Sequence, residues 1–123
     1  MKKFNRAIGA KGEEIASNYL KQNGYQILDR NNLTRWGELD LIVTKNKTLV
    51  FVEVKFKTTE EFGTPEEMIS QNKLIQVKRT AEMYLAINPD IAQKYESYQI
   101  DAVCIVGQDG KIDRLEHYEN LGF

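Results

Sequence analysis

The sequence predicts an α/β fold, with a single three-layer domain in which a mixed central sheet is flanked by helices. Two segments place apolar residues at helical spacing, one at Ile8–Asn23 and one that follows Thr64. Between them lie two β-prone segments, Gly37–Val43 and Leu49–Lys55, and further β-rich segments close the chain. A chain of 123 residues has room for one core, so we expect a single domain over residues 1–123.

Composition limits the function classes. Hydrophobic residues make up 41% and charged residues 28% of the chain, which is typical of a folded globular protein. The formal net charge of −1 excludes a broadly basic surface, so any affinity for nucleic acid must come from local clusters and depend strongly on salt. No apolar run suits a signal peptide or a membrane span, so we expect a cytoplasmic protein without a membrane partner.

Apolar spacing predicts the first helix over Ile8–Asn23, with Gly24 as its stop signal. Glu13 lies at the border of the apolar stripe and is predicted to reach the sheet edge, whereas Glu14 points to solvent. An acid at such a border serves either a metal site or a solvated flank, and the sequence leaves both open. The apolar stripe comprises Ile8, Gly12, Ile15, Ala16, Tyr19 and Leu20.

A short strand at Tyr25–Leu28 and a polar loop at Asp29–Trp36 are predicted to follow. The loop carries Arg30, Arg35 and Trp36, and loops beside strand-borne sites commonly hold binding residues. Arginine suits the phosphate backbone and an aromatic ring suits the bases, so these three residues are candidates for nucleic-acid binding. Packing of the tryptophan against the domain is the alternative.

The two β-prone segments are predicted to form a hairpin. If its turn centres on Asn46 and Lys47, Asp40 lies directly opposite Glu53. Like charges so paired destabilise a sheet unless a cation lies between them. Glu53 and Lys55 share one face of their strand, so an acid and a lysine converge on Asp40. Two carboxylates of this kind suit Mg²⁺, and the lysine can stabilise charge on a phosphoryl oxygen or hold the attacking water deprotonated.

The same register places Glu38 opposite Lys55, so the lysine could instead form a cross-strand ion pair worth a few tenths of a kcal/mol. From residue chemistry alone, a metal site and a solvated face of mixed charges both remain open.

A capping-box pattern with proline at the first helical position predicts that the second long helix begins at Thr64–Glu67 and ends at Ala86. The connector Asn88–Ser97 contains a start signal for one more helical turn, at Pro89. The buried stripe of the long helix is predicted to comprise Leu74, Val77, Ala81, Tyr84 and Leu85.

The chain is predicted to close with a β-rich run at Gln99–Val106, a turn at Gly107–Gly110 and an edge element at Lys111–Tyr118. His117 has no partner at zinc-like spacing and is interpreted as a structural residue.

Several motifs resemble one known family. The chain resembles the YraN-type family of small uncharacterised bacterial proteins, which are similar to restriction-endonuclease-like nucleases and archaeal Holliday-junction resolvases. The two most specific matches are the segments Gly37–Ile42 and Val50–Lys55. The other matching positions are Gly12, Glu13, Ala16, Arg30, Asn31, Gly63, Lys73 and Ala81.

The resemblance implies a restriction-endonuclease-like core with a metal site. Asp40 and Glu53 would hold Mg²⁺ or Mn²⁺, and the backbone carbonyl of Val54 would add a ligand. Lys55 would assist the attacking water, and Glu13 would complete the site from the first helix.

The resemblance also implies that Lys73 lies near the scissile phosphate, and it adds Lys57 to the candidate nucleic-acid-binding residues. The chain departs from the family pattern at four positions. Lys57 stands where arginine is frequent, Leu33 replaces a basic residue, Trp36 replaces a small one, and Gln99 stands where arginine is common. These changes remove positive charge or alter shape on the expected nucleic-acid side.

The sequence therefore favours a metal-dependent endonuclease that acts on structured DNA in bacterial DNA processing. By analogy with resolvases, a homodimer is expected, because two nicks need two sites. The alternatives are a binding module that keeps the fold without cleavage, and a protein-interaction domain that uses Tyr95, Tyr98 and Phe123.

Overall fold

The computed structural model describes the backbone of residues 2–123 and the side chains of residues 11–123. It contains a five-stranded sheet in the order β1-β2-β3-β4-β5, in which only the β3–β4 pair is parallel. The elements are α1 (Lys2–Gln22), β1 (Gln26–Thr34), β2 (Gly37–Lys45), β3 (Thr48–Lys57), the 3₁₀ turn η1 (Glu66–Met68), α2 (Gln71–Ile87), α3 (Pro89–Ala92), β4 (Ser97–Gln108) and β5 (Lys111–Tyr118).

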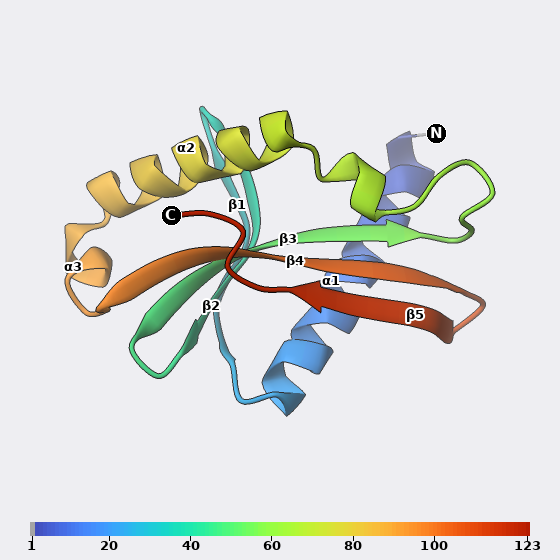
Figure 1. The fold of residues 1–123 in the computed structure, drawn as a ribbon, viewed down its shortest axis with the longest axis horizontal. Helices are drawn as coiled ribbons and strands as arrows, with labels where there is room; N and C mark the ends of the chain where they lie inside the picture. The colour runs from blue at the N-terminus through green and yellow to red at the C-terminus, as the bar shows by residue number, and fades with distance from the viewer. Residues whose placement is uncertain (1) are drawn as a thin grey trace.

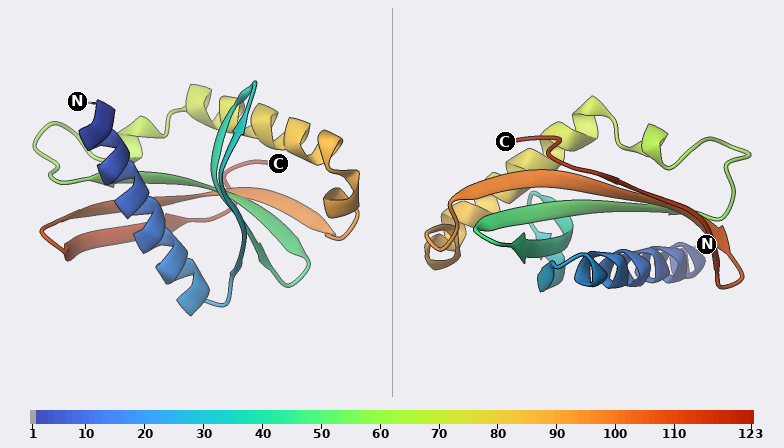
Figure 2. Two further views of the ribbon diagram at one scale, coloured as in Figure 1. Left: turned by 180° about the vertical axis from the view of Figure 1, so that it is seen from behind. Right: turned by 60° about the horizontal axis from the view of Figure 1, so that its bottom comes forward.

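The two long helices cover opposite faces of the sheet (Figures 1 and 2), so the predicted three-layer α/β domain with a mixed sheet is confirmed. Alternation along β3 builds both cores, because Val52 packs with α1 on one face while Phe51 packs with α2 on the other. The α1 face gathers Ala16 and Leu20 among its fully buried side chains. Most of the buried apolar side chains belong to these two layers, and their packing fixes the strands between them.

Helix α1 ends where the sequence predicts. Gly24 adopts a φ of 89°, the N–H of Tyr25 donates to the carbonyl of Leu20 at 3.0 Å, and the N–H of Gly24 donates to that of Lys21 at 3.1 Å. This is a Schellman cap, which favours glycine at the left-handed position. The helix begins earlier than predicted, at Lys2, and the Ile8 side chain of the predicted stripe lies outside the described side chains.

The predicted loop over Asp29–Trp36 is wrong. Strand β1 runs through it to Thr34 and pairs with β2, with a bulge between Ile27 and Asp29. The segment looks loop-like in sequence because β1 is an edge strand of the sheet and is largely exposed, so it tolerates polar residues that a central strand would exclude. Only two residues, Arg35 and Trp36, are left to form the turn.

The predicted start of the second helix at Thr64 is also wrong. The capping pattern there forms only η1, in which the N–H of Glu67 donates to Thr64 Oγ1 at 3.3 Å. The chain then leaves helical geometry at Ile69, and α2 begins at Gln71 with Ser70 as its N-cap. Two adjacent start signals compete in the sequence, and the tertiary fold uses the second for the long helix.

The remaining elements match expectation. The β2–β3 hairpin has the predicted register, with Leu41 opposite Val52 and Val43 opposite Val50, and its turn residue Asn46 has a φ of 56°. The short helix starts at the predicted proline, and the last two strands form with modest extensions. Among the described helices, none combines the length and apolar character that a membrane crossing requires.

Close packing of α1 on β3 requires a glycine. A Cβ added at Gly12 would lie 2.7 Å from the Cβ of Phe56, an atom that cannot move without the strand backbone. We expect Gly12→Ala to lower the free energy of unfolding by about 1–3 kcal/mol through overpacking, although alanine is normally the better helix former. The control Asn18→Ala, at an exposed position of the same helix, is expected to be neutral or slightly stabilising. Urea unfolding measures both, and a stabilised Gly12→Ala variant would contradict this packing.

Candidate functional site

The site lies where β2 separates from β3. The hairpin ladder runs from Lys45 opposite Thr48 to Leu41 opposite Val52, and Asp40 is the residue before Leu41 in β2. The ladder therefore ends one pair before the predicted pairing of Asp40 with Glu53, because the Asp40 side chain bonds the backbone of β3 at that point. Asp40 Oδ2 accepts a hydrogen bond of 2.9 Å from the N–H of Val54, so its carboxylate takes the place of a neighbouring strand's carbonyl. The carboxylate therefore sits in the gap between the strands, within reach of both faces of the sheet.

On the α2 face, Glu53 is surrounded by two lysines. Its Oε1 atom lies 3.7 Å from Lys55 Nζ and 3.6 Å from Lys73 Nζ, and its side chain is only 4% exposed. Lys73 occupies the first turn of α2, where its N–H donates to the Ser70 side chain at 3.1 Å. The N-cap therefore holds the lysine over the strand. The alternative ion pair of Lys55 with Glu38 is absent among the described side chains.

On the α1 side, Glu13 comes close to two acids of β2. Carboxylate oxygens of Glu13, Glu38 and Asp40 all lie within 4.8 Å of one another. The sequence predicts that Glu13 lies at the border of the apolar stripe and reaches the sheet edge. In the structure its carboxylate lies beside that of Asp40, at this edge. Asp40 therefore faces acids on both sides: Glu53 of β3 on one, and Glu13 of α1 with Glu38 of β2 on the other. These four acids are here named the acidic cluster.

Burial raises the pKa of three acids in this neighbourhood. Burial and then the Asp40 carboxylate raise the pKa of Glu53 to about 7, against the opposing effect of the two lysines. Burial, Asp40 and Glu38 raise the pKa of Glu13 to about 7, although Asn31 and Arg30 act in the opposite direction. Burial also raises the pKa of Asp40. Acids in such a state favour a bound proton or a bound cation.

Sequence reasoning missed two members of this neighbourhood. From the sequence, Glu38 is interpreted only as a partner for Lys55. Its spacing of two residues from Asp40 nevertheless predicts that both acids share one face of the strand. Asn31 has a φ of 51° on β1, and its side chain lowers the pKa of Glu13 through a hydrogen bond. No sequence signal indicated that contact, because it depends on β1 pairing with β2.

The candidate nucleic-acid residues are spread around the site. Arg30 lies on β1 rather than in a loop, close enough to lower the pKa of Glu13. Arg35 and Trp36 form the turn of the β1–β2 hairpin, with the guanidinium carbon 5.5 Å from the centre of the indole ring. Lys57 Nζ donates to the carbonyl of Gly63 at 3.2 Å, so this lysine holds the segment that follows β3.

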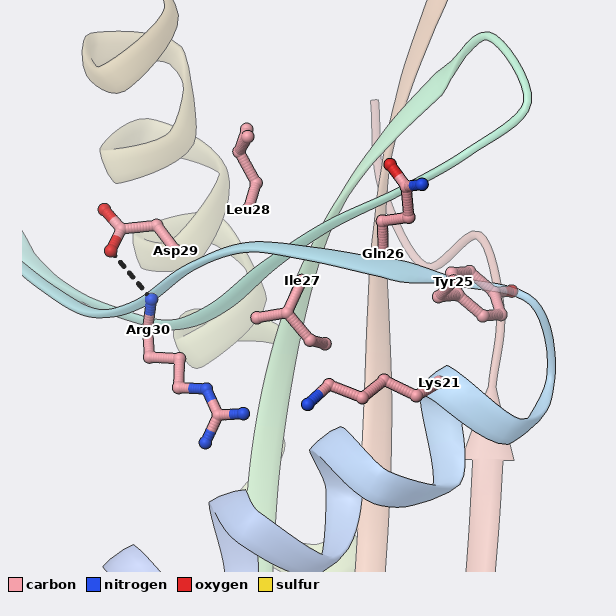
Figure 3. A pocket seen from close by; sticks show the side chains of 7 residues that line it. All are labelled: Lys21, Tyr25, Gln26, Ile27, Leu28, Asp29 and Arg30. Atoms are coloured by element: carbon pink, nitrogen blue, oxygen red, sulfur yellow. Dashed lines mark hydrogen bonds between the residues drawn. The ribbon is translucent and has the colours of Figure 1, made fainter.

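An open groove of about 620 Å³ runs beside β1, between the strand and the end of α1 (Figure 3). Lys21 and Arg30 extend into it from α1 and β1 on the same side of the strand, whereas Asp29 lies on the other side. Of these two cations, Arg30 is the one close enough to lower the pKa of Glu13.

A second group of polar side chains lies at the β4–β5 end of the sheet. Oxygens and ring nitrogens of Asp101, His117 and Glu119 lie within 4.8 Å of one another. Asp101 is fully buried, and it accepts hydrogen bonds from Gln99 Nε2, from the N–H of Asn120 and from His117 Nε2, at 2.8–2.9 Å. These contacts use its lone pairs and hold the chain end against β4, which accords with a structural histidine.

The fold and the site together define a class. The mixed sheet with a helix on each face is compatible with a restriction-endonuclease-like core. The model of the uncharacterised protein family UPF0102 matches residues 12–105. The chain belongs to this family.

Relatives support that membership. The chain is 41% identical over 117 residues to a UPF0102 protein of Syntrophomonas wolfei, covering 95% of this chain and 98% of that protein. It is 48% identical over 85 residues to a UPF0102 protein of Alkaliphilus oremlandii, covering 69% and 73% of the two chains. A UPF0102 protein of Pelotomaculum thermopropionicum is 37% identical over 116 residues, or 94% of each chain.

The raised pKa values predict an unusual pH dependence in metal-free solution. A carboxyl whose folded pKa lies near 7 contributes stability that is full below its unfolded value of 4.5 and is lost as the pH rises through 7. We therefore expect the melting temperature in EDTA to fall between about pH 4.5 and 7, and Glu53→Gln to flatten this slope. Glu14→Gln, at an exposed position, is expected to leave the slope intact. A wild-type melting temperature that rises steadily over this range would contradict the prediction.

Proposed function

We propose that this protein is a metal-dependent endonuclease that hydrolyses phosphodiester bonds in structured DNA, in the bacterial cytoplasm. The observation that carries the proposal is the close pair of the half-buried Asp40 and the buried Glu53, with Lys55 and Lys73 both within 3.7 Å of Glu53. A protein does not gain stability by burying two carboxylates together, so the arrangement is best explained by a ligand that both acids share.

The donor set fits Mg²⁺ or Mn²⁺. Both ions prefer oxygen ligands, and Mg²⁺ is typically held by one or two carboxylates together with water and substrate phosphate oxygens. Asp40 and Glu53 would hold the ion. The carbonyl of Val54 would add a third oxygen, because it points to the same side of β3 as the N–H that meets Asp40. Glu13 would complete the site from α1.

When bound, such an ion polarises the phosphoryl group and lowers the pKa of water. Lys55 carries a positive charge beside the site and would stabilise the charge that develops on a phosphoryl oxygen, or hold the attacking water in its deprotonated form. Lys73 would contact the phosphate from α2. Hydrolysis forms a bond between the water oxygen and phosphorus, breaks the bond to the leaving oxygen, and gives that oxygen a proton.

In this proposal, cationic side chains and one aromatic side chain outside the acidic cluster make the contacts with DNA. Arg30, Arg35 and Lys57 would contact the DNA backbone, and Trp36 would contact bases. One site per chain cuts one strand at each binding event, so the proposal includes a homodimer for cuts in two strands.

Titration calorimetry with Mn²⁺ tests the metal site. We expect wild type to bind Mn²⁺, and Asp40→Asn and Glu53→Gln each to weaken binding at least tenfold, because each removes a charged ligand. Glu14→Gln makes the same change in net charge at an exposed position, and it is expected to bind Mn²⁺ like wild type. Equal Mn²⁺ affinity in all four proteins would refute the metal site.

Cleavage of branched DNA tests the role of Lys55. Lys55→Ala is expected to retain Mn²⁺ binding and to lower the single-turnover cleavage rate by about 10²–10³-fold, since one stabilising group is lost. Lys94→Ala, a control at an exposed lysine just after α3, is expected to cleave normally. Unchanged cleavage by Lys55→Ala would show that the lysine has another role. DNA binding without any cleavage by wild type would identify a binding module instead.

A further inference from the structure

The turn of the β1–β2 hairpin, residues 33–36, presents an exposed apolar and cationic surface, here named the hairpin tip. Leu33 is 79% exposed and Trp36 is 39% exposed, so the tip presents two large apolar side chains to solvent. The Arg35 guanidinium carbon lies 5.5 Å from the centre of the Trp36 ring. An indole ring beside a guanidinium favours a ligand that offers both a π face and negative charge.

The hairpin tip is held firmly. Thr34 Oγ1 donates to the carbonyl of Gly37 at 2.8 Å and accepts the N–H groups of Trp36 and Gly37, each at 3.1 Å. The hydroxyl of the buried Thr80, on α2, lies 3.3 Å from the carbonyl oxygen of Trp36. The tip backbone is therefore fixed before any ligand arrives, which reduces the entropy lost on binding.

The hairpin tip lies a short distance from the acidic cluster. Thr80 and Lys73 are seven residues apart on α2, two helical turns or about 10 Å along the axis. Lys73 contacts Glu53, and Thr80 contacts Trp36. Figure 2 shows the hairpin rising beside α2. Stacked nucleotides advance about 3.4 Å each, so a strand that passes the acidic cluster would reach the tip within a few nucleotides.

We propose that the hairpin tip is a stacking platform for an unpaired base, so that the preferred substrate carries unpaired nucleotides beside the bond to be cut. A base within a duplex is covered on both faces by its neighbours, whereas an unpaired base can place one face on an aromatic ring. Arg35 would contact the adjoining phosphate. This inference rests on the proposed function, because it needs a nucleic acid at the acidic cluster.

The single tryptophan of the chain makes the platform directly observable, because all indole fluorescence comes from Trp36. The experiment uses the full chain with Asp40→Asn, which retains an acceptor for the N–H of Val54 and prevents cleavage. It is titrated with a duplex that contains a three-nucleotide single-stranded gap, and with the intact duplex of the same sequence. We expect the gapped DNA to quench the fluorescence by at least half at saturation, and the intact duplex to quench it by less than a tenth.

Anisotropy of labelled DNA supplies a second readout. In the same Asp40→Asn background, Trp36→Ala is expected to weaken binding of gapped DNA about tenfold and binding of intact duplex less than twofold. Trp36→Phe keeps an aromatic face and is expected to restore most of the affinity. Ile87→Ala removes an exposed apolar side chain at the far end of α2 and is expected to change neither affinity.

Three results would overturn the platform: saturating gapped DNA without quenching, an equal loss of affinity for both DNAs in Trp36→Ala, or no binding of either DNA. Any of these would show that the hairpin tip does not select an unpaired base. Cleavage by wild type together with absent quenching would remove the platform and leave the nuclease proposal standing. Quenching by gapped DNA in a chain whose wild type binds no Mn²⁺ would remove the nuclease and keep the platform.

Discussion

The contact between the Asp40 carboxylate and the N–H of Val54 is the constraint on which the site depends. Strand β2 pairs with β3 only as far as Leu41, and beyond it β2 continues with β1 alone. The carboxylate fills the place that a backbone carbonyl would take, which satisfies the N–H and fixes the acid between the strands. Its negative charge then meets Glu53 from the same sheet, and the burial of Glu53 limits the screening of the pair by water.

Both helices converge on this gap. Helix α1 packs closely on β3 through Gly12 and brings Glu13 to one side of Asp40. Helix α2, capped by Ser70, brings Lys73 to Glu53 on the other. The three layers of the fold therefore each supply charged groups to one small volume, and the acids outweigh the lysines there. Burial first, and the nearby Asp40 carboxylate second, raise the pKa of both Glu13 and Glu53, and the proposed divalent cation would offset both effects.

Much of the site could be predicted because it depends on short-range geometry. The hairpin turn at Asn46 fixes the β2–β3 register, and alternation then places Glu53 and Lys55 on one face. The paths of β1 and the start of α2 could not be predicted in this way. Edge strands tolerate polar residues, so β1 looks like a loop in the sequence. Two capping signals lie close together, at Thr64 and Ser70, and only the tertiary contacts decide which of them begins the long helix.

The sequence by itself determined the α/β class, the β2–β3 register and the shared strand face of Glu53 and Lys55, because periodicity and turn chemistry act over a few residues. Only the tertiary structure decided that β2 leaves β3 at Asp40, that Glu38 and Asn31 join the cluster, and that Trp36 is carried on a rigid hairpin against α2. These features depend on twist and packing between elements distant in the chain, and no local pattern of residues encodes them.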